Sequence, residues 1–361
     1  MKQSSSQSNS QDTTGSRARR GFTLVELLVV IVIIGLLMAV LIPAVTAGMR
    51  AARRGVITNE ISLISQSLQA FSTNKGVPFP PAYIDAGSQT NLQQIQKFQQ
   101  LLARTHRNRD ARYGGNQTGA ADYANNGDYP TNPNDPNSLV NFANLDCAEA
   151  WVLWLLGTTD NAQYPMCGRA NNNPNLKVAI WVSPEMASPA IEVPARNSLF
   201  EFDQTRLRDE DRDGFPEYYP AHGTNPEPYI YYPSTDYRRA YFNPASQPYY
   251  YVSAANPTMA RLAPLPYLAN LPNDLKQNVG QTTAVTVSNR LTFAEPDRFQ
   301  VLAPGLDGRY LPQGFEIAQS QQYFVMFAYP DGPYTAQNIN DSAHRDNITN
   351  FAGGTLESKM P

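Results

Sequence analysis

Hydrophobic and polar positions divide the chain into a polar start, one long apolar run and a mixed remainder. Residues 1–20 are rich in Ser and Gln, whereas residues 22–45 are almost unbroken in Leu, Val and Ile. At about 1.5 Å per helical residue, the apolar run is long enough for the roughly 30 Å hydrocarbon core of a bilayer. We therefore predict a transmembrane helix at residues 22–45, behind a cytoplasmic leader at residues 1–21.

The apolar pattern continues beyond Pro43 with steps of mostly three and four residues, which is typical of one face of a helix. We predict an amphipathic continuation over residues 46–73, with the face from Ile61 onward packed on the protein's own head. Pro43 lacks a backbone N–H, so we expect the helix to bend or melt locally there. The positions that define the stripe are Val45, Met49, Ala52, Val56, Ile61, Ile64, Leu68 and Phe71.

Residues 74–361 predict an extracytoplasmic α+β head. Helical spacing occurs over Asn91–Arg104 and Asn144–Leu156, and short runs rich in aromatic and β-branched residues predict strands. We expect the strands to form an antiparallel sheet that rests on the long helix. The expected strands are Lys177–Val182, Tyr229–Tyr232, Tyr249–Val252, Ala284–Val287, Phe299–Leu302 and Tyr323–Tyr329.

Composition narrows the function classes. The formal net charge is -3, with 16% charged residues, so the balance gives no reason to expect a nucleic-acid partner. The 29 prolines and 20 tyrosines favour a head of loops and short strands. The three histidines lie in no metalloprotease motif and beside no recognisable nucleophile motif, so we assign no catalytic residue and predict that the protein is not an enzyme.

A carboxylate inside the apolar run does not fit a plain membrane anchor. Basic residues before the run place the N-terminus inside and the head outside, although Arg50, Arg53 and Arg54 weaken this count. Glu26 lies within the run, where an ionised carboxylate costs about 2.5–3.5 kcal/mol on insertion scales. Glu26 is therefore predicted to be functional and to need a positive partner.

The segment GFTLVE at residues 21–26 resembles the processing site of type IV prepilins and type II secretion pseudopilins. In that family the peptidase cuts after the Gly and methylates the new N-terminal residue, and a Glu stands at the fifth mature position. Counted from Phe22, Glu26 is fifth and Pro43 falls at the position where the family commonly has Pro. The resemblance implies a pilin-like α+β fold, processing at Gly21 and Phe22, and assembly roles for Glu26 and Pro43.

The resemblance also implies a function. The leading hypothesis is a structural subunit of a pseudopilus or pilus, most specifically a major-type pseudopilin of a type II secretion system. The implied partners are prepilin peptidase, copies of itself, other pseudopilins or pilins and the inner-membrane assembly platform. The chain would cross the inner membrane once, with its head in the periplasm. The freed α-amino group of Phe22, most plausibly from a neighbouring subunit, would supply the cation that Glu26 needs.

Two other functions remain open on the sequence. The first is a type IV minor pilin or tip adhesin, for which a large head at the end of a filament would be tolerated. The second belongs to another class: a membrane-tethered extracytoplasmic binding protein or enzyme that uses the prepilin signal only for export. The number of copies in a filament separates the structural readings, and a head that keeps a ligand and never enters filaments would indicate the last.

An acidic loop in the head is a candidate calcium site. Asp209, Asp211 and Asp213 alternate before a Gly, and Glu217 follows, which supplies several oxygen ligands from one short segment. An EF-hand would need Glu where Pro220 stands, so the loop more closely resembles the shorter Asp-rich loops of dockerin and thrombospondin-like calcium modules. The alternative is a solvated acidic turn.

Two segments near the C-terminus resemble the Gly-Pro-Asp-Gly and Asp-Asp-Ile-x-x-Trp segments of major pseudopilins. They are residues 303–308 and 345–351, and in that family the loop between them holds calcium. The resemblance implies Asp307 and Asp346 as ligand candidates. Arg345 replaces the first of the paired Asp residues and Phe351 replaces the Trp. The alternative is a pair of ordinary Asp-Gly turns.

The chain has two cysteines, Cys147 and Cys167. A head outside the cytoplasm would permit a disulfide between them. The alternative is that Cys147 is a buried thiol on a helix and that Cys167 lies in a loop too far away to bridge. The sequence leaves both possibilities open.

Overall fold

The computed structural model describes residues 23–80, 82, 100–101, 103–105, 130–132, 135–139, 146–157, 168–170, 173–178, 191–192, 198–208, 215–223, 226–237, 264–270, 290–310, 326–328, 332–334 and 346–356. The chain forms two compact units, residues 1–50 and 51–361. One helix, α1 (Leu24–Lys75), begins in the first unit and ends in the second.

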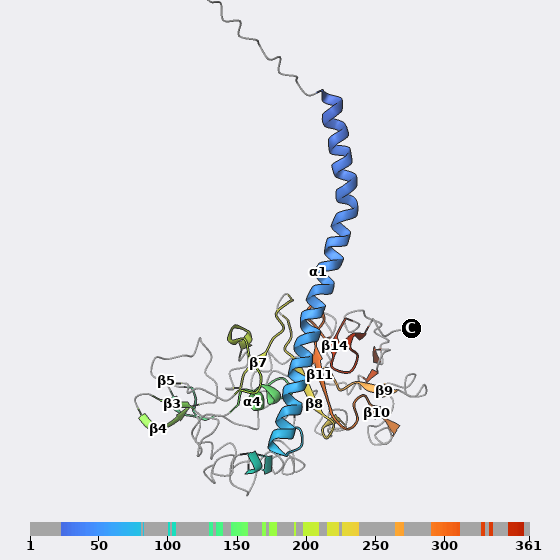
Figure 1. Cartoon of the computed structure of the whole chain (residues 1–361). Coiled ribbons are helices and arrows are strands. Elements are labelled where there is room, and N and C mark those ends of the chain that lie inside the picture. Colours follow the sequence, from blue (N-terminus) through green and yellow to red (C-terminus); the bar gives the residue numbers. More distant parts are fainter. Residues whose placement is uncertain are drawn as a thin grey trace, which may run out of the picture. The chain divides into compact units, whose positions relative to one another are not determined.

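Helix α1 is a continuous element of 52 residues, coloured blue in Figure 1. It confirms the predicted helix and ends two residues beyond the expected position, where Gly76 takes a positive φ of 60°. Pro43 lies inside it without interrupting it, so the local melting expected at this residue is wrong. Thr46 donates its hydroxyl to the Ile42 carbonyl (3.0 Å) and to the Pro43 carbonyl (2.8 Å), on the C-terminal side of the proline.

The two halves of α1 differ in burial. All residues from Leu24 to Arg50 are exposed. The part of α1 that belongs to the second unit has one buried face. This face confirms the predicted stripe and begins one turn earlier, because Ile57 is also fully buried. The buried residues are Ile57, Ile61, Ile64, Leu68 and Phe71.

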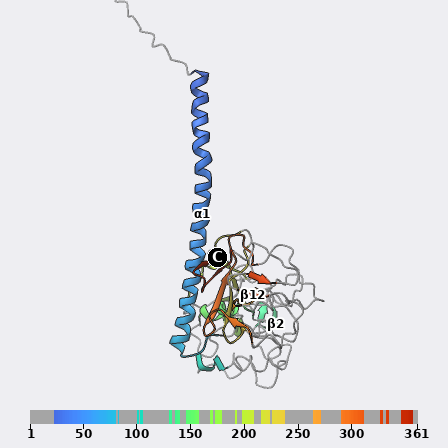
Figure 2. The same ribbon diagram turned by 90° about the vertical axis from the view of Figure 1, so that its right-hand side faces the viewer.

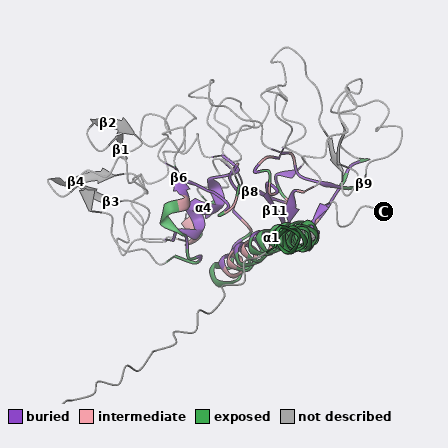
Figure 3. Ribbon diagram, turned by 90° about the horizontal axis from the view of Figure 1, so that it is seen from above, coloured by how far each residue is buried: buried purple, intermediate pink, exposed green. Residues whose placement is uncertain are grey.

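The buried face of α1 packs on a short helix and a sheet of the head. Helix α4 (Ala150–Leu155) is wholly buried, and the ring of its Trp154 lies 5.6 Å from that of Phe71. Figure 3 shows the buried residues of α4, β8 and β11 in purple on the side that faces α1. Helix α4 is shorter than predicted: residues 147–149 form a turn before it, in which the Asp146 carboxylate accepts the backbone N–H groups of Ala148 and Glu149.

The central sheet has the order β15-β14-β11-β8, and all its pairs are antiparallel. Strands β8 (Ile230–Pro233) and β11 (Phe299–Ala303) confirm two predicted strands within one residue, and Phe299 pairs with Pro233. Both strands are buried throughout, so neither shows a solvent face. The remaining members are β14 (Ile348–Thr349) and β15 (Gly354–Thr355). The second half of α1 lies beside this sheet (Figures 1 and 2).

A second sheet has the order β10-β9-β12-β13. Its strands are β10 (Thr292–Phe293), β9 (Leu268–Asn270), β12 (Met326–Ala328) and β13 (Gly332–Tyr334). β12 pairs with β9 in parallel, which departs from the expected antiparallel arrangement. Gln300 of β11 links the two sheets, because its amide group accepts from Tyr267 N–H (2.7 Å) and donates to the Tyr267 (2.9 Å) and Ala294 (2.8 Å) carbonyls.

The other described strands form three small antiparallel sheets, so the head has several sheets where one was expected. Their orders are β1-β2, β4-β3-β5 and β6-β7. The strands are β1 (Pro130–Asn132), β2 (Asp135–Leu139), β3 (Gly168–Ala170), β4 (Asn173–Val178), β5 (Ile191–Glu192), β6 (Leu207–Arg208) and β7 (Glu217–Tyr218).

The remaining predicted elements are met in part. The prediction at 177–182 overlaps β4 by two residues, and the one at 323–329 contains β12. Residues 100–101 and 103–105 are helical at the end of the helix predicted for 91–104. The strands predicted at 249–252 and 284–287 lie outside the described residues.

Buried tyrosines hold several proline-containing loops. Tyr231 donates its hydroxyl to the Pro80 carbonyl (2.9 Å), and Tyr232 donates to that of Pro264 (3.0 Å). Tyr310 donates to the Pro228 carbonyl (2.7 Å). Proline has no N–H group, so a loop built from it makes fewer backbone bonds. A tyrosine hydroxyl that donates to the carbonyl of such a proline gives the loop one additional fixed hydrogen bond.

Candidate functional site

The N-terminus of α1 is closed by reciprocal hydrogen bonds between Thr23 and Glu26. Glu26 Oε2 accepts from the Thr23 backbone N–H and from its hydroxyl, both at 2.9 Å. Glu26 N–H in turn donates to Thr23 Oγ1 at 3.3 Å. This is a capping box, in which Thr at the N-cap and Glu three residues later satisfy free donors of the first turn. Thr23 thus gives Glu26 local hydrogen-bond donors but no positive charge, so the cationic partner of Glu26 stays a prediction.

Residues 16–42 match the family described as the prokaryotic N-terminal methylation motif. The N-terminus is that of a type IV prepilin-like protein. The matched segment contains Glu26, together with Gly21 and Phe22, which lie outside the described residues, and it ends one residue before Pro43. Such a motif implies processing by prepilin peptidase and assembly with other pilins. No curated protein and no solved structure was found to match the chain.

The prepilin-like helix fits a membrane anchor. By length and composition alone, α1 is the one helix in the described part of the chain that could cross a membrane. Together with the methylation motif, this fits a single-pass membrane-anchored protein.

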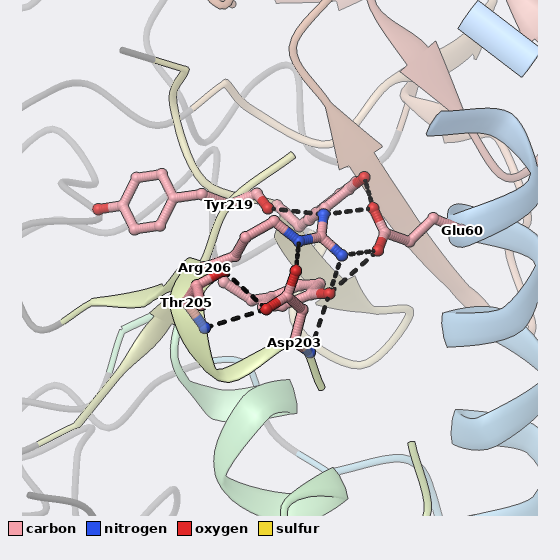
Figure 4. A network of polar contacts seen from close by, with 7 residues as sticks. Glu60, Asp203, Thr205, Arg206 and Tyr219 are labelled. Carbon is pink, nitrogen blue, oxygen red and sulfur yellow. Dashed lines mark hydrogen bonds and ion pairs between the residues drawn. The ribbon is translucent and has the colours of Figure 1, made fainter. Parts of the chain in front are cut away.

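A second carboxylate on α1, Glu60, lies in the head unit and binds residues far away in the sequence. Arg206 is the last residue of the short 3-10 helix η2 (Gln204–Arg206). It donates through Nη1 to Glu60 Oε2 at 3.0 Å, and its Nη2 pairs with Glu60 Oε1. The hydroxyls of Tyr218 and Tyr229 also donate to the two carboxylate oxygens, the former at 3.1 Å. Figure 4 shows the carboxylate facing the guanidinium. We call Glu60, Arg206, Tyr218 and Tyr229 the Glu60 clasp.

The clasp is supported by a second layer of contacts. Asp203 Oδ2 lies 3.4 Å from Arg206 Nε, and Asp203 Oδ1 accepts from the Thr205 N–H and hydroxyl. The Arg206 guanidinium also lies 4.4 Å from the centre of the Tyr218 ring. These contacts hold the plane of the Arg206 guanidinium in one orientation, which favours a bidentate ion pair with Glu60.

The charge states of Arg206, Tyr218 and Tyr229 are fixed at ordinary pH. Burial lowers the pKa of Arg206, but its hydrogen bonds to Glu60 and the Glu60 charge raise it above its usual value overall. Burial, followed by the Glu60 charge, raises the pKa of Tyr218 and Tyr229. Arg206 therefore stays protonated and both phenols stay neutral, so these three partners of Glu60 keep their role as donors at ordinary pH.

Sequence analysis missed the Glu60 clasp. Glu60 stands directly before Ile61 and three residues after Ile57, at the edge of the buried stripe. An acid in that position indicates a basic partner in the head. Nothing in the sequence identified Arg206 as that partner, because 146 residues separate the two.

Asp307 and Asp346, the two ligand candidates that the resemblance implied, lie near each other in the structure, and calcium binding by them stays a prediction. Asp346 Oδ2 accepts the Leu306 N–H at 2.8 Å, and Asp346 also takes a hydrogen bond from the Asp307 backbone. A Cβ added at Gly305 would lie 1.9 Å from Asp346 Cγ, so only Gly leaves room for this carboxylate. Burial and the charge of Asp307 raise the pKa of Asp346 to about 6.

These two carboxylates fit one side of a divalent-cation site. Asp346 Oδ1 is buried without a hydrogen-bond partner, and a cation would satisfy it and offset the repulsion from Asp307. Among the described residues no group of three or more His, Cys, Asp or Glu side chains gathers at one point. Further ligands would therefore be backbone carbonyls, water or residues outside the described ranges.

The acidic loop of the other predicted site is only partly described. Glu217 is fully buried in β7, opposite Arg208 of β6, at the base of a hairpin. Asp209, Asp211 and Asp213 lie outside the described residues, between these two strands in the sequence. Calcium binding by this loop stays a prediction.

Cys147 is buried in the turn before α4 and forms no disulfide within the described residues. Burial, followed by the Asp146 charge, raises the pKa of the thiol well above its usual value, so it is a poor nucleophile. Cys167 lies outside the described residues, and a disulfide between the two stays a prediction.

Proposed function

We propose that the protein is a structural subunit of a pseudopilus or pilus, and that it acts as a major-type pseudopilin of a type II secretion system. The methylation motif at residues 16–42, which opens a continuous 52-residue helix, supports this proposal. Prepilin peptidase would cleave after Gly21 and methylate Phe22. The protein would then work in secretion without catalysing a reaction, in contact with its own copies, other pseudopilins and the inner-membrane assembly platform.

The capping box suggests how Glu26 serves both before and after cleavage. Thr23 occupies Glu26 Oε2, and no hydrogen bond is recorded for Oε1 within the described residues. The α-amino group released on Phe22 would carry a positive charge, and that of a neighbouring subunit would pair with Oε1. Cleavage thus creates the cation, and assembly delivers it to a carboxylate whose other oxygen is already held.

The decisive test is the intact mass and N-terminal sequence of the protein recovered from its native membrane. We expect a chain that begins with methylated Phe22. A chain that still begins at Met1 would contradict processing and would favour the membrane-tethered binding protein or enzyme. In a second experiment, Glu26→Ala should abolish incorporation into filaments while leaving the membrane level of the subunit similar. Unchanged incorporation would refute the charge-pairing account.

We also propose that calcium is held in part by Asp307 and Asp346. The partnerless Asp346 Oδ1 and the neighbouring Asp307 charge support this proposal. The ion would join residues 305–308 to the residues just before β14, a strand of the central sheet. Its function would be structural stabilisation of the subunit in the periplasm.

A minor pilin or tip adhesin is the second candidate. The size of the unit formed by residues 51–361, with its several small sheets, favours a head that is tolerated at a filament end. Quantifying copies per filament by labelled electron microscopy separates the two: many copies along the length indicate the major subunit, and one or a few at an end indicate the tip.

A further inference from the structure

We propose that Arg50 and Arg53 bind the phosphate groups of anionic phospholipids in the outer leaflet of the membrane that α1 crosses. Both side chains are exposed, and they lie five and eight residues beyond the end of the apolar run at residues 22–45. The chemical class of ligand is a phosphodiester with a net negative headgroup. The inference rests on the membrane span and is independent of cleavage and of filament type.

Helix geometry gathers three guanidinium groups on one side of α1. Residues three and four apart are neighbours on a helix surface, so Arg50, Arg53 and Arg54 lie within one turn of one another. Like charges at this spacing repel by a few tenths of a kcal/mol per pair in an isolated helix. An anion placed among them removes this penalty.

The arginines differ in what they contact. Arg54 is partly buried and lies close enough to Asp346 for its charge to lower the pKa of that carboxyl group. Arg50 and Arg53 have no ion-pair or hydrogen-bond partner for their side chains within the described residues. One of the three thus belongs to the head, and the other two are available to a ligand.

The depth of the helix places them at the headgroups. Arg50 follows Glu26 by 24 residues, a rise of about 36 Å in an α-helix. A bilayer has a core of about 30 Å and a thickness of about 40–45 Å with its headgroups. If the apolar run at residues 22–45 fills the core, Arg50 and Arg53 lie five and eight residues beyond it, a rise of about 8 and 12 Å, and their long side chains reach the outer headgroup layer.

This location decides between lipid and protein as the partner. Guanidinium groups bind phosphate oxygens in a bidentate manner, and a phospholipid presents those oxygens at this depth around every unassembled subunit. Basic residues are disfavoured beside a span on the translocated side. Their presence here is explained if they hold the helix at a fixed depth until assembly withdraws it from the bilayer.

The test uses the full-length protein in a neutral detergent and counts bound lipid by native mass spectrometry. Phosphatidylglycerol and phosphatidylcholine are titrated against wild type, the double variant R50Q/R53Q and the matched control K75Q/R104Q. The control removes the same charge from exposed residues, and Lys75 lies 25 residues after Arg50 in the sequence. Circular dichroism confirms that each variant is folded.

We expect wild type and K75Q/R104Q to prefer phosphatidylglycerol and R50Q/R53Q to lose roughly tenfold to thirtyfold in affinity for it at low salt. Inorganic phosphate and soluble glycerophosphoglycerol should not displace the lipid. Equal affinity of wild type for the two lipids, equal loss in both double variants, or displacement by free phosphate would overturn the proposal. So would an R50Q/R53Q protein that keeps its lipid but loses self-association, since the partner would then be a second copy.

Discussion

The two halves of α1 each carry one carboxylate near apolar residues, and they satisfy it in different ways. Glu26 bonds to Thr23, three residues away, in a segment whose other side chains are all exposed. Glu60 bonds to Arg206, Tyr218 and Tyr229, which are 146 to 169 residues away. The carboxylate of the first half is therefore satisfied within its own helix, and the exposed side chains around it can contact other molecules. The carboxylate of the second half is bound to the head.

The largest effect is expected at the committed carboxylate. Glu60→Ala leaves the Arg206 guanidinium without its main partner, and the side chains of Arg206 and Glu60 are only 17% and 12% exposed. Breaking such a pair from one side should cost about 3 kcal/mol of unfolding free energy. Urea unfolding of the full chain, followed by tryptophan fluorescence, measures it. The exposed Glu201→Ala is the control, and a loss below about 1 kcal/mol at Glu60 would remove the basis of the comparison.

The next largest effect concerns another long-range carboxylate, Asp346. Gly305→Ala would place a Cβ within 1.9 Å of Asp346 Cγ, and overpacking of this kind costs about 1–3 kcal/mol. Gly55→Ala is the matched control, because a Cβ there meets nothing within 4 Å and Ala favours a helix. The two substitutions should therefore change the melting temperature of the full chain in opposite directions. The same sign at both positions would contradict the packing described for Asp346.

A smaller effect is expected at the local carboxylate. Thr23→Val removes the N-cap hydroxyl, which should cost about 1 kcal/mol and speed hydrogen exchange of the first-turn amides about fivefold. Thr23→Ser keeps the hydroxyl and should exchange like wild type. Exchange is measured by mass spectrometry on the reconstituted chain. If Val and Ser behave alike, Thr23 does not hold Glu26.

The smallest effect is the pH and calcium dependence of the head. The pKa of Asp346 is raised to about 6, so the folded state holds this proton more tightly than the unfolded chain does. Stability should then fall as pH rises from about 4 through about 6, because ionisation places a charge on a partly buried carboxyl group and also brings it into repulsion with Asp307. Solvent screening at this partly exposed group keeps the loss under about 1 kcal/mol.

Calcium should offset that loss above pH 6 and do little at pH 4. Thermal melting with added calcium or with EDTA tests this, and Asp307→Asn should flatten the pH dependence. A melting temperature at pH 7.5 that is the same with added calcium, with EDTA and with neither would remove the case for calcium in the head.

Sequence reasoning succeeded where neighbours in the chain determine the structure. The 52-residue helix, its buried stripe and the methylation motif follow from local pattern, and strands β8 and β11 were found because their aromatic and β-branched residues are contiguous. In each case the informative residues lie within one short segment.

It failed where distant segments meet. Strands of two residues, such as β6 and β7, carry no periodic signal, and the parallel contact of β9 with β12 depends on tertiary packing. The clasp between Glu60 and Arg206 has the same cause. The role of Gln300 as a bridge between sheets was also hidden, because a single polar residue inside a strand predicts nothing about which backbone it will reach.

The phenols that bind carbonyls at Pro80, Pro228 and Pro264 would have a consequence for a head that lies outside the cytoplasm, as proposed. Extracytoplasmic heads with many loops are often stapled by disulfides, which oxidants form and reductants break. A hydrogen bond from a tyrosine hydroxyl to a carbonyl needs no oxidant to form and is not broken by a reductant. The loops it pins hold their places whether the surroundings are oxidising or reducing, and no folding catalyst for thiols is needed to set those particular contacts.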